Sequence, residues 1–244
     1  MPRHTLIIEE ASLQLVPKRM WRHRNCISFQ DKFGLTPERQ ILDDNFHHDI
    51  VRDLGGVEKL GRPDVVHFAL LDVVSTPLYM RGSIDVFVHS VENKTIHVMP
   101  GTRLPRTLHR FCGLMSKILA NEIGEEESRL FDFNGAETIK DLLDRLDPTL
   151  VVALTKSGTL VDLRDALGSL SASLTERIVW LVGGFPHGHF QPTLLELSDR
   201  VISISEFSLP AHVVTARLSY EIERRELSER KTQENSNPQT TVEP

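Results

Sequence analysis

Short apolar runs alternate with amphipathic stretches along much of the chain, and this alternation restricts the possible folds more than any other feature. Runs at 149–155, 177–184 and 200–204 have the length of buried strands. Helical patterns at 162–176 and 210–225 lie between or after them. Because neighbouring parallel strands need a long crossover, usually a helix, the sequence predicts an α/β fold with a mostly parallel sheet.

The rest of the chain adds a smaller set of predicted elements. We expect a strand at 6–8, helices at 37–54, 105–120 and 137–146, and a β-hairpin across 83–99. The segment 63–74 is apolar almost throughout, so it fits either one buried helix or a strand that runs into a helix. Residues 1–225 are predicted to form the folded domain, and the mainly polar residues 226–244 a disordered tail.

Composition and cysteine content argue against several classes of protein. Of the 244 residues, 40% are hydrophobic and 25% charged, and no apolar run is long enough to span a bilayer. We therefore expect a cytoplasmic protein with no membrane partner. Cys26 and Cys112 are the only cysteines, which argues for a reducing compartment and against a disulfide framework or a cysteine-built zinc site. The pair His187 and His189 lacks a third ligand at a useful spacing, so we expect no metal.

Three arginines within nine residues stand out in a chain whose formal net charge is −6. Arg103, Arg106 and Arg110 lie in a stretch that contains no acid. On a helix that begins near Pro105, Arg106 and Arg110 share a face at the end whose free N–H groups and partial positive charge attract anions. This spacing favours the binding of several phosphates. The alternative is that the arginines are solvated or pair with the acidic run at 121–150.

A second candidate site lies where the predicted strand at 177–184 ends. Gly183, Gly184 and Gly188 let the backbone turn sharply and let a ligand approach closely. Loops of small residues also follow the two other C-terminal strands, and in open α/β sheets ligands bind at the carboxyl ends of strands. These loops suit a flat, mostly neutral ligand such as an adenosine moiety, although turn formation alone also explains such glycines.

Five sequence blocks, in this order and spacing, resemble one family: GRPDVVH (61–67), TRLPRTLHRF (102–111), TKSG (155–158), GGFPHG (183–188) and ISISEFSLPA (202–211). The family is that of the SPOUT-class methyltransferases of ribosome biogenesis, which methylate N1 of a pseudouridine in small-subunit rRNA. The resemblance implies a SPOUT-type α/β fold with a C-terminal trefoil knot, and it makes residues 1–225 a methyltransferase domain with a family-specific insertion. It also implies S-adenosylmethionine as cofactor and a homodimer that binds an rRNA loop across both subunits.

The resemblance assigns roles to individual residues. The RNA-binding arginines of the family correspond to Arg62, Arg103, Arg106 and Arg110, and Asp64 orients Arg62 beside the reacting base. Cofactor contacts correspond to residues in the three strand-end loops, namely Leu154, Thr155, Gly183, Gly184, Gly188, Ile202, Ser203, Ile204, Ser205, Glu206, Phe207 and Leu209.

These assignments imply a mechanism and leave two alternatives open. Arg62 would stabilise negative charge on the base as N1 loses its proton, whereas Asp64, paired with an arginine, makes a poor base. The alternatives are a SPOUT methyltransferase with a different RNA target and a non-catalytic rRNA-binding assembly factor. Other ribosome assembly factors are expected partners, and in a eukaryote the location would be nucleolar.

Overall fold

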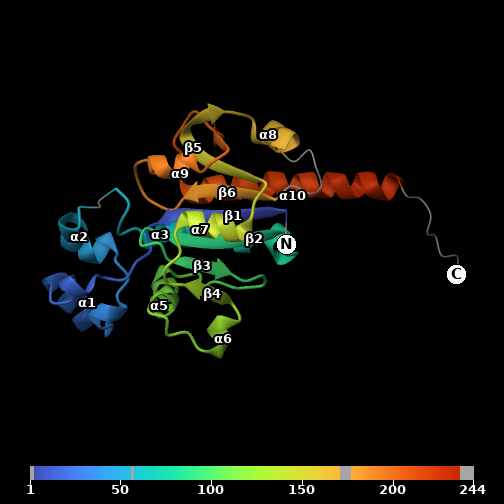
Figure 1. Cartoon of the computed structure of the whole chain (residues 1–244). Coiled ribbons are helices and arrows are strands. Elements are labelled where there is room, and N and C mark those ends of the chain that lie inside the picture. Colours follow the sequence, from blue (N-terminus) through green and yellow to red (C-terminus); the bar gives the residue numbers. More distant parts are fainter. Residues whose placement is uncertain (1–2, 56–57, 171–176, 237–244) are drawn as a thin grey trace, which may run out of the picture.

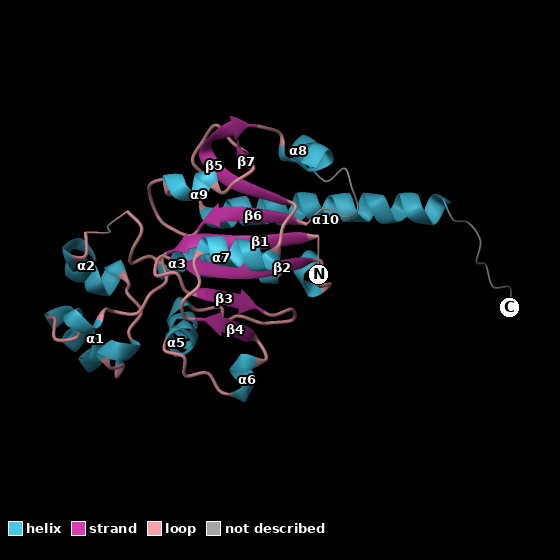
Figure 2. Cartoon of the chain, viewed as in Figure 1, coloured by secondary structure: helices cyan, strands magenta, loops and turns pink. Residues whose placement is uncertain are grey.

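The computed structural model describes residues 3–55, 58–170 and 177–236, and its centre is a seven-stranded sheet of order β4-β3-β2-β1-β6-β5-β7. Figures 1 and 2 show the strands as one central layer with helices around it. The strands are β1 (His4–Ala11), β2 (Ile84–Ser90), β3 (Thr95–Val98), β4 (Phe131–Asn134), β5 (Leu150–Leu160), β6 (Ile178–Gly183) and β7 (Arg200–Ser203).

The helices and two short 3-10 turns connect these strands. The helices are α1 (Arg24–Phe33), α2 (Asp44–Asp53), α3 (Pro63–Val74), α4 (Pro77–Met80), α5 (Leu108–Leu119), α6 (Glu125–Ser128), α7 (Ile139–Leu146), α8 (Leu163–Leu170), α9 (Pro192–Glu196) and α10 (Ala211–Ser236). The 3-10 turns are Lys18–Met20 and Pro37–Arg39.

Parallel pairing dominates the sheet. β1 pairs in parallel with both β2 and β6, and β5 pairs in parallel with both β6 and β7. The β2–β3 and β3–β4 pairs are antiparallel, which confirms the hairpin expected across 83–99. Every residue of β1 is buried, as is usual for a central strand of a sheet that is covered on both faces. The predicted α/β fold with a mostly parallel sheet is therefore confirmed.

Helices cover both faces of the sheet. Leu6 and Ile8 of β1 belong to one core, which includes residues of α3, α5, α8 and α10. Ile7 belongs to a second core, formed with residues of α7 and α9. The switch of face at each residue follows from the two-residue period of a strand. The result is a three-layer domain in which the strand ends, rather than the sheet faces, are available for a binding site.

α1 and α2 form a small unit of their own, which Figure 1 shows beside the sheet. Their core consists of Val16, Cys26, Leu42, Ile50 and Val51, with other side chains partly buried around it. This core is separate from the two cores that flank the sheet.

The single helix expected across 37–54 is wrong, because the chain is extended between the 3-10 turn and α2. The Val16 N–H donates to the Gln40 carbonyl at 2.9 Å, and the Leu42 N–H donates to the Gln14 carbonyl at 2.9 Å. These strand-like hydrogen bonds compete with the helix. Asp43 then caps α2 by accepting the Asn45 N–H at 3.0 Å.

The remaining elements agree with expectation more closely. The segment 63–74 is one buried helix, α3, and the strand at 6–8 and the helix at 137–146 are present as β1 and α7. α8 accounts for 163–170 of the helix expected at 162–176, and residues 171–176 lie outside the described part of the chain.

α10 is longer than the helix expected at 210–225 and continues to Ser236, into the stretch expected to be disordered. Figure 1 shows it reaching well past the sheet. Ion pairs one turn apart support the extension, with Arg225 to Glu229 at 2.8 Å and Arg230 to Glu226 at 3.7 Å. The rest of the expected tail, 237–244, lies outside the described residues. Among the helices described, none has both the length and the apolar composition to cross a bilayer.

β5 contacts β7 at two places. Leu154 pairs with Ile202 and, after a register shift, Thr159 pairs with the same Ile202 and Leu160 with Ser203. Residues 155–158 of β5, between the two contacts, form an irregular bulge. These pairings do not trace the path of the chain through a loop, so the trefoil knot stays a prediction.

The second contact requires a glycine at 158, which gives a test of the packing. A Cβ added to Gly158 would lie between 2.5 and 2.7 Å from three backbone atoms of Ile202. We expect Gly158→Ala to lower the free energy of unfolding by about 1–3 kcal/mol, measured by urea denaturation. Gly113→Ala in α5 is the matched control, since its Cβ meets nothing within 4 Å and alanine should stabilise the helix by roughly 0.5–1 kcal/mol. Equal effects of the two changes would contradict the close approach.

Candidate active site

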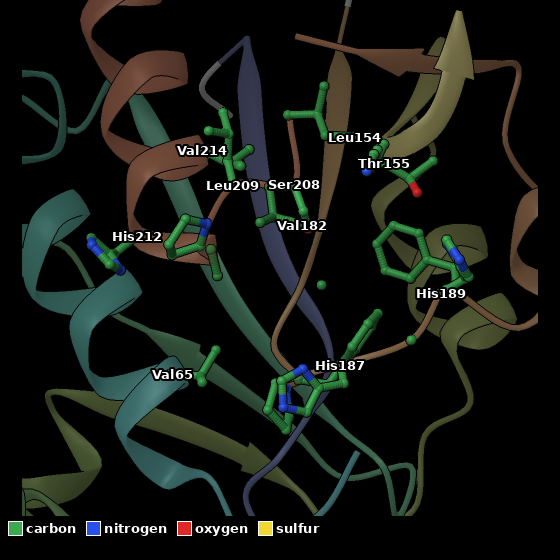
Figure 3. Close-up of a pocket in the computed structure, with 18 of the residues that line it drawn as sticks. Val65, Leu154, Thr155, Val182, His187, His189, Ser208, Leu209, His212 and Val214 are labelled. Carbon is green, nitrogen blue, oxygen red and sulfur yellow. The ribbon is translucent and has the colours of Figure 1, made fainter. Parts of the chain in front are cut away.

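The carboxyl ends of β5, β6 and β7 surround a cavity of about 580 Å³. Its walls are residues 154–156 of β5, where the pairing of β5 with β6 ends, the loops after β6 and β7, the first turns of α3 and the start of α10. Figure 3 shows Leu154 and Thr155 on one side of the cavity, Val65 and His212 on the other, and His187 at one end. Cavities of about 300–1,000 Å³ that combine apolar walls with a few polar groups are typical of cofactor and substrate sites.

The loop after β6 depends on two glycines. A Cβ on Gly183 would lie 2.8 Å from the ring of Phe185, and it would project from a residue that lines the cavity. Gly188 has a φ of +92°, in the left-handed region that glycine adopts without strain. Glycine at 183 therefore makes room for the Phe185 ring in the cavity wall, and glycine at 188 permits the turn of the loop.

Two acidic residues fix this loop to the segment that leads into α3. The Glu58 carbonyl accepts the His187 N–H at 3.1 Å. The Glu10 carboxylate accepts the Gln191 N–H at 3.0 Å and also forms an ion pair with Lys59. The position of the loop is thus set by the same short segment, 58–60, that precedes the first turn of α3.

The loop after β7 is shaped by serine hydroxyls. Ser203 Oγ donates to the Ser205 carbonyl at 2.8 Å, and Ser205 Oγ accepts the Phe207 N–H at 3.0 Å. The Val161 N–H donates to the Ser203 carbonyl at 2.9 Å, which ties this loop to the end of β5. Phe207 lines the cavity and is 75% exposed, so it lies at the rim.

Arg62 and Asp64 lie at the start of α3, where both line the cavity. The guanidinium donates to the carboxylate through two hydrogen bonds, Nε to Oδ1 at 2.8 Å and a terminal nitrogen to Oδ2 at 2.7 Å. The Arg62 N–H also donates to Ser12 Oγ at 2.8 Å, which fixes the backbone at the N-cap. This two-point pairing holds the guanidinium in one orientation at the cavity wall while leaving it partly exposed.

The protonation of Asp64 is set by two opposing effects. Partial burial raises the pKa of this carboxyl, but the hydrogen bonds and positive charge of Arg62 outweigh that effect and hold the pKa below its ordinary value. Asp64 is therefore ionised at neutral pH and is a weak proton acceptor. The position and negative charge of its carboxylate allow it to orient the Arg62 guanidinium.

The three clustered arginines lie on an extended segment and the first turn of α5, not on one helix. α5 begins at Leu108, so the helix expected from Pro105 is wrong in its first turn. The reason is tertiary: His67 Nε2 donates to the Pro105 carbonyl at 2.7 Å and holds this segment against α3. Arg106 precedes the N-cap, Thr107, and therefore does not share a helix face with Arg110.

All three arginines of this basic segment, residues 103–110, are exposed and none lines the cavity. Within the described residues, Arg103, Arg106 and Arg110 form no ion pair with a carboxylate, including those of the acidic stretch that follows. The segment lies against α3, whose first turn lines the cavity. It is thus a cationic surface next to the cavity rather than a part of its wall.

Most of the expected site residues line the cavity. They are Arg62, Asp64, Leu154, Thr155, Gly183, Gly188, Ser203, Ile204, Ser205, Phe207 and Leu209. Gly184, Ile202 and Glu206 do not line it. A Cβ on Gly184 would meet Ile8 at 2.7 Å, so this glycine packs against β1.

A second group of residues lines the cavity without having been predicted from the sequence. They are Val65, Phe68, Lys156, Val182, Phe185, Pro186, His187, His189, Phe190, Ser208, Pro210, Ala211, His212 and Val214. Many lie within or next to the quoted sequence blocks, so position in the chain was an available signal. His187 and His189 were considered only as metal ligands, and in the part of the chain described by the structure no group of three His, Cys, Asp or Glu side chains is placed to hold a metal ion.

Comparisons with known proteins agree with this geometry. Residues 6–223 match the family described as EMG1/NEP1 methyltransferase. The chain is 34% identical over 186 residues to the ribosomal RNA small subunit methyltransferase Nep1 of Pyrococcus furiosus, covering 76% of this chain and 82% of that protein. It is 32% identical over 189 residues to the protein of the same name from Thermococcus sibiricus, covering 78% of this chain and 84% of that protein.

A solved structure extends the agreement to the fold. The crystal structure of Archaeoglobus fulgidus Nep1 bound to S-adenosylhomocysteine matches with a TM-score of 0.77 and 31% identity, and the match covers 90% of this chain and 97% of that chain. The mostly parallel α/β sheet matches that structure, in agreement with the SPOUT fold that the resemblance implied. The chain belongs to the EMG1/NEP1 methyltransferase family.

The lowered pKa of Asp64 predicts a pH-dependent contribution to stability. A carboxyl with a depressed folded-state pKa stabilises the protein above its unfolded pKa, about 3.9, and this stabilisation is lost as pH falls through the folded value. We expect Asp64→Asn to lower the free energy of unfolding at pH 7 by roughly 1 kcal/mol, because Arg62 is partly exposed. In urea denaturation, the difference from wild type should shrink below about pH 4.

The matched control for this prediction is Asp144→Asn, which removes an exposed carboxylate paired with Lys140. That change should have little effect at any pH. A difference between wild type and Asp64→Asn that stays constant from pH 7 to pH 3 would contradict the role of the ionised Arg62–Asp64 pair.

Proposed function

We propose that this methyltransferase transfers a methyl group from S-adenosylmethionine to N1 of a pseudouridine in a loop of small-subunit rRNA, and that it acts in ribosome biogenesis. One observation carries the proposal: the basic segment lies against α3, and the first turn of α3 lines the cavity. Arg62 lies in the cavity wall at the N-cap of α3, and a hydrogen bond from His67 of α3 to the Pro105 carbonyl holds the segment that carries the three arginines against the same helix. The family and the relatives described as rRNA methyltransferases support the choice of substrate.

The cavity fits the proposed cofactor in size and chemistry. Its volume of about 580 Å³ lies within the range of cofactor sites, and glycine at 183 makes room for the Phe185 ring in the cavity wall. The loops at 183–189 and 203–209 would hold the adenosine and methionine parts through their backbone groups. When bound, S-adenosylmethionine supplies an electrophilic methyl group on a sulfonium.

The protein's own residues would orient the base and stabilise its charge. A pseudouridine N1 loses a proton as it gains the methyl group, so negative charge develops on the base. The Arg62 guanidinium, held by Asp64 at 2.7 and 2.8 Å, is placed in the cavity wall to stabilise that charge. A target base must be flipped out of its loop to enter such a cavity, and single-stranded loops permit this.

Arg103, Arg106 and Arg110 would grip the phosphates of the same loop. Exposed guanidinium groups without carboxylate partners bind phosphate in a bidentate way. The grip leaves the base free to reach the cavity beside Arg62. A non-catalytic role in rRNA folding would use the same contacts.

We propose a homodimer as the working form, with the rRNA loop bound across both subunits. Large apolar side chains on the surface support an interface: Phe207 is 75% and Tyr220 63% exposed.

The function is tested by incubating the protein with labelled S-adenosylmethionine and two matched rRNA hairpins, one with uridine and one with pseudouridine at the target. We expect label to enter only the pseudouridine hairpin, because its N1–H has no counterpart in uridine. Equal labelling of both hairpins would instead support a different target atom. Tight binding of hairpin and cofactor without transfer would support the assembly-factor alternative.

Gly183→Val should separate the cofactor site from the RNA surface. The valine side chain would displace the ring of Phe185, which lines the cavity, so we expect S-adenosylhomocysteine affinity to fall at least tenfold by calorimetry, a loss of about 1.4 kcal/mol. RNA affinity should stay close to wild type, because the basic segment does not contact this loop. Wild-type affinity for S-adenosylhomocysteine would refute the placement of the cofactor.

A further inference from the structure

An aromatic cluster joins α1 and α2 to the basic segment. The rings of Phe29, Phe33 and Phe46 contact one another with centroids between 4.6 and 5.3 Å apart. His109, in the first turn of α5, lies 5.7 Å from Phe33. We call Phe33, Phe46, Lys32 and His109 the aromatic patch. The patch lies outside the cavity. It belongs neither to the proposed cofactor site nor to the proposed phosphate contacts of Arg103, Arg106 and Arg110.

Phe33 and Phe46 of the aromatic patch are more exposed than their neighbour Phe29. Phe33 is 36% and Phe46 37% exposed, whereas Phe29 lies deeper and contacts the buried ring of His47 at 5.2 Å. Packing of α1 on α2 therefore accounts for the position of Phe29. It leaves more than a third of the surface of Phe33 and of Phe46 exposed to solvent. Exposed rings of this size commonly mark a binding surface.

The charges around the patch favour an anionic partner. Lys32 Nζ lies 5.0 Å from the centroid of Phe33 and 5.6 Å from that of Phe46. Arg106 and Arg110 flank His109 in the sequence, and within the described ranges Lys32, Arg106 and Arg110 form no ion pair. Aromatic faces among cations are the usual surface for unpaired nucleotides, whose bases stack while their phosphates bind the cations.

We propose that the aromatic patch is a second RNA-contact site, where an unpaired nucleobase stacks on one of the two nearly perpendicular rings, Phe33 or Phe46, and meets the edge of the other, next to the phosphates held by Arg106 and Arg110. The inference rests on the proposed function, since it takes the rRNA loop as substrate. It adds a base contact remote from the cavity, so one loop is held at the target base, at its phosphates and at a flanking base.

Stacking and phosphate contacts differ in their salt dependence, which gives the test. The probe is a fluorescent rRNA hairpin with pseudouridine in its loop, and anisotropy gives Kd at several salt concentrations. Phe33→Leu with Phe46→Leu keeps apolar volume against Phe29 but removes the flat faces. We expect about tenfold weaker binding with an unchanged salt slope. Arg106→Ala should instead reduce that slope by about one counterion.

Matched variants separate stacking from general damage to the fold. Ile27→Ala changes an apolar residue on the same helix that is 48% exposed, and it should leave Kd unchanged. Phe33→Tyr keeps the ring and should bind like wild type. Wild-type affinity of each variant for S-adenosylhomocysteine would show that the domain is folded.

A cross-linking experiment on the wild-type protein does not depend on the folding of any variant. Hairpins that carry 5-iodouridine at single positions flanking the target should cross-link, at one position, to the peptide that contains Phe33 or Phe46. Cross-links confined to other peptides would overturn the inference.

The outcomes distinguish failure of the proposed function from failure of the aromatic patch as an RNA contact. If the wild-type protein binds none of the hairpins, the proposed function fails. If Arg106→Ala weakens binding while the double leucine variant binds like wild type, the aromatic patch is not an RNA contact and the proposed function stands.

Discussion

The parallel pairing of β5 with both β6 and β7 is the constraint on which the site depends. Parallel strands end at the same edge of a sheet, so the three loops that follow these strands must meet. The second contact, between Thr159 and Ile202, brings the end of β5 back to β7 and is possible because residue 158 has no side chain. The cavity is thus a consequence of strand order and of one close backbone approach, and the loop side chains only adjust its chemistry.

α3 connects the cavity to the basic segment. Its first turn carries Arg62 and Asp64 in the cavity wall, and one turn later His67 donates to the Pro105 carbonyl at 2.7 Å. His67 is fully buried and its ring stacks on Phe111 at 4.4 Å. Burial lowers its pKa, which favours the neutral ring at physiological pH, so this donor is a fixed anchor rather than a charge switch. The distance between the basic segment and Arg62 in the cavity wall is therefore set by a rigid helix.

The parts of the fold that the sequence predicted are those decided by local pattern. Buried strands such as β6 are continuous apolar runs, and Gly183 marks where β6 ends. The parts that it did not predict are decided by contacts between distant segments. The start of α5 depends on His67, and the break before α2 depends on hydrogen bonds from residues 14–16 to 40–42.

The residues of the candidate site divide in the same way, into those that a local sequence pattern indicates and those that it does not. The loop after β6 was found from its glycines, and the other two strand-end loops from their small residues. The roles of Arg62 and Asp64 and the individual cofactor contacts came from the family resemblance. Phe68 and His212 line the cavity from α3 and α10, and each directly follows a quoted sequence block, so position was the only signal for them; the helical pattern itself does not separate a lining residue from a packing residue.

The net charge of −6 is a poor guide to the partner because the acids are used locally. In the acidic stretch 121–150, carboxylates pair with nearby cations or cap helices: Glu137 with Arg145 at 2.8 Å, Glu127 with Lys117 at 3.6 Å, and Asp141 with the Thr138 hydroxyl at 2.6 Å. These contacts leave the basic segment without carboxylate partners within the described residues, which decides against the alternative that its arginines pair with this run. A polyanion that approaches α5 meets the local field of that segment, and the remaining acids disfavour binding elsewhere on the surface.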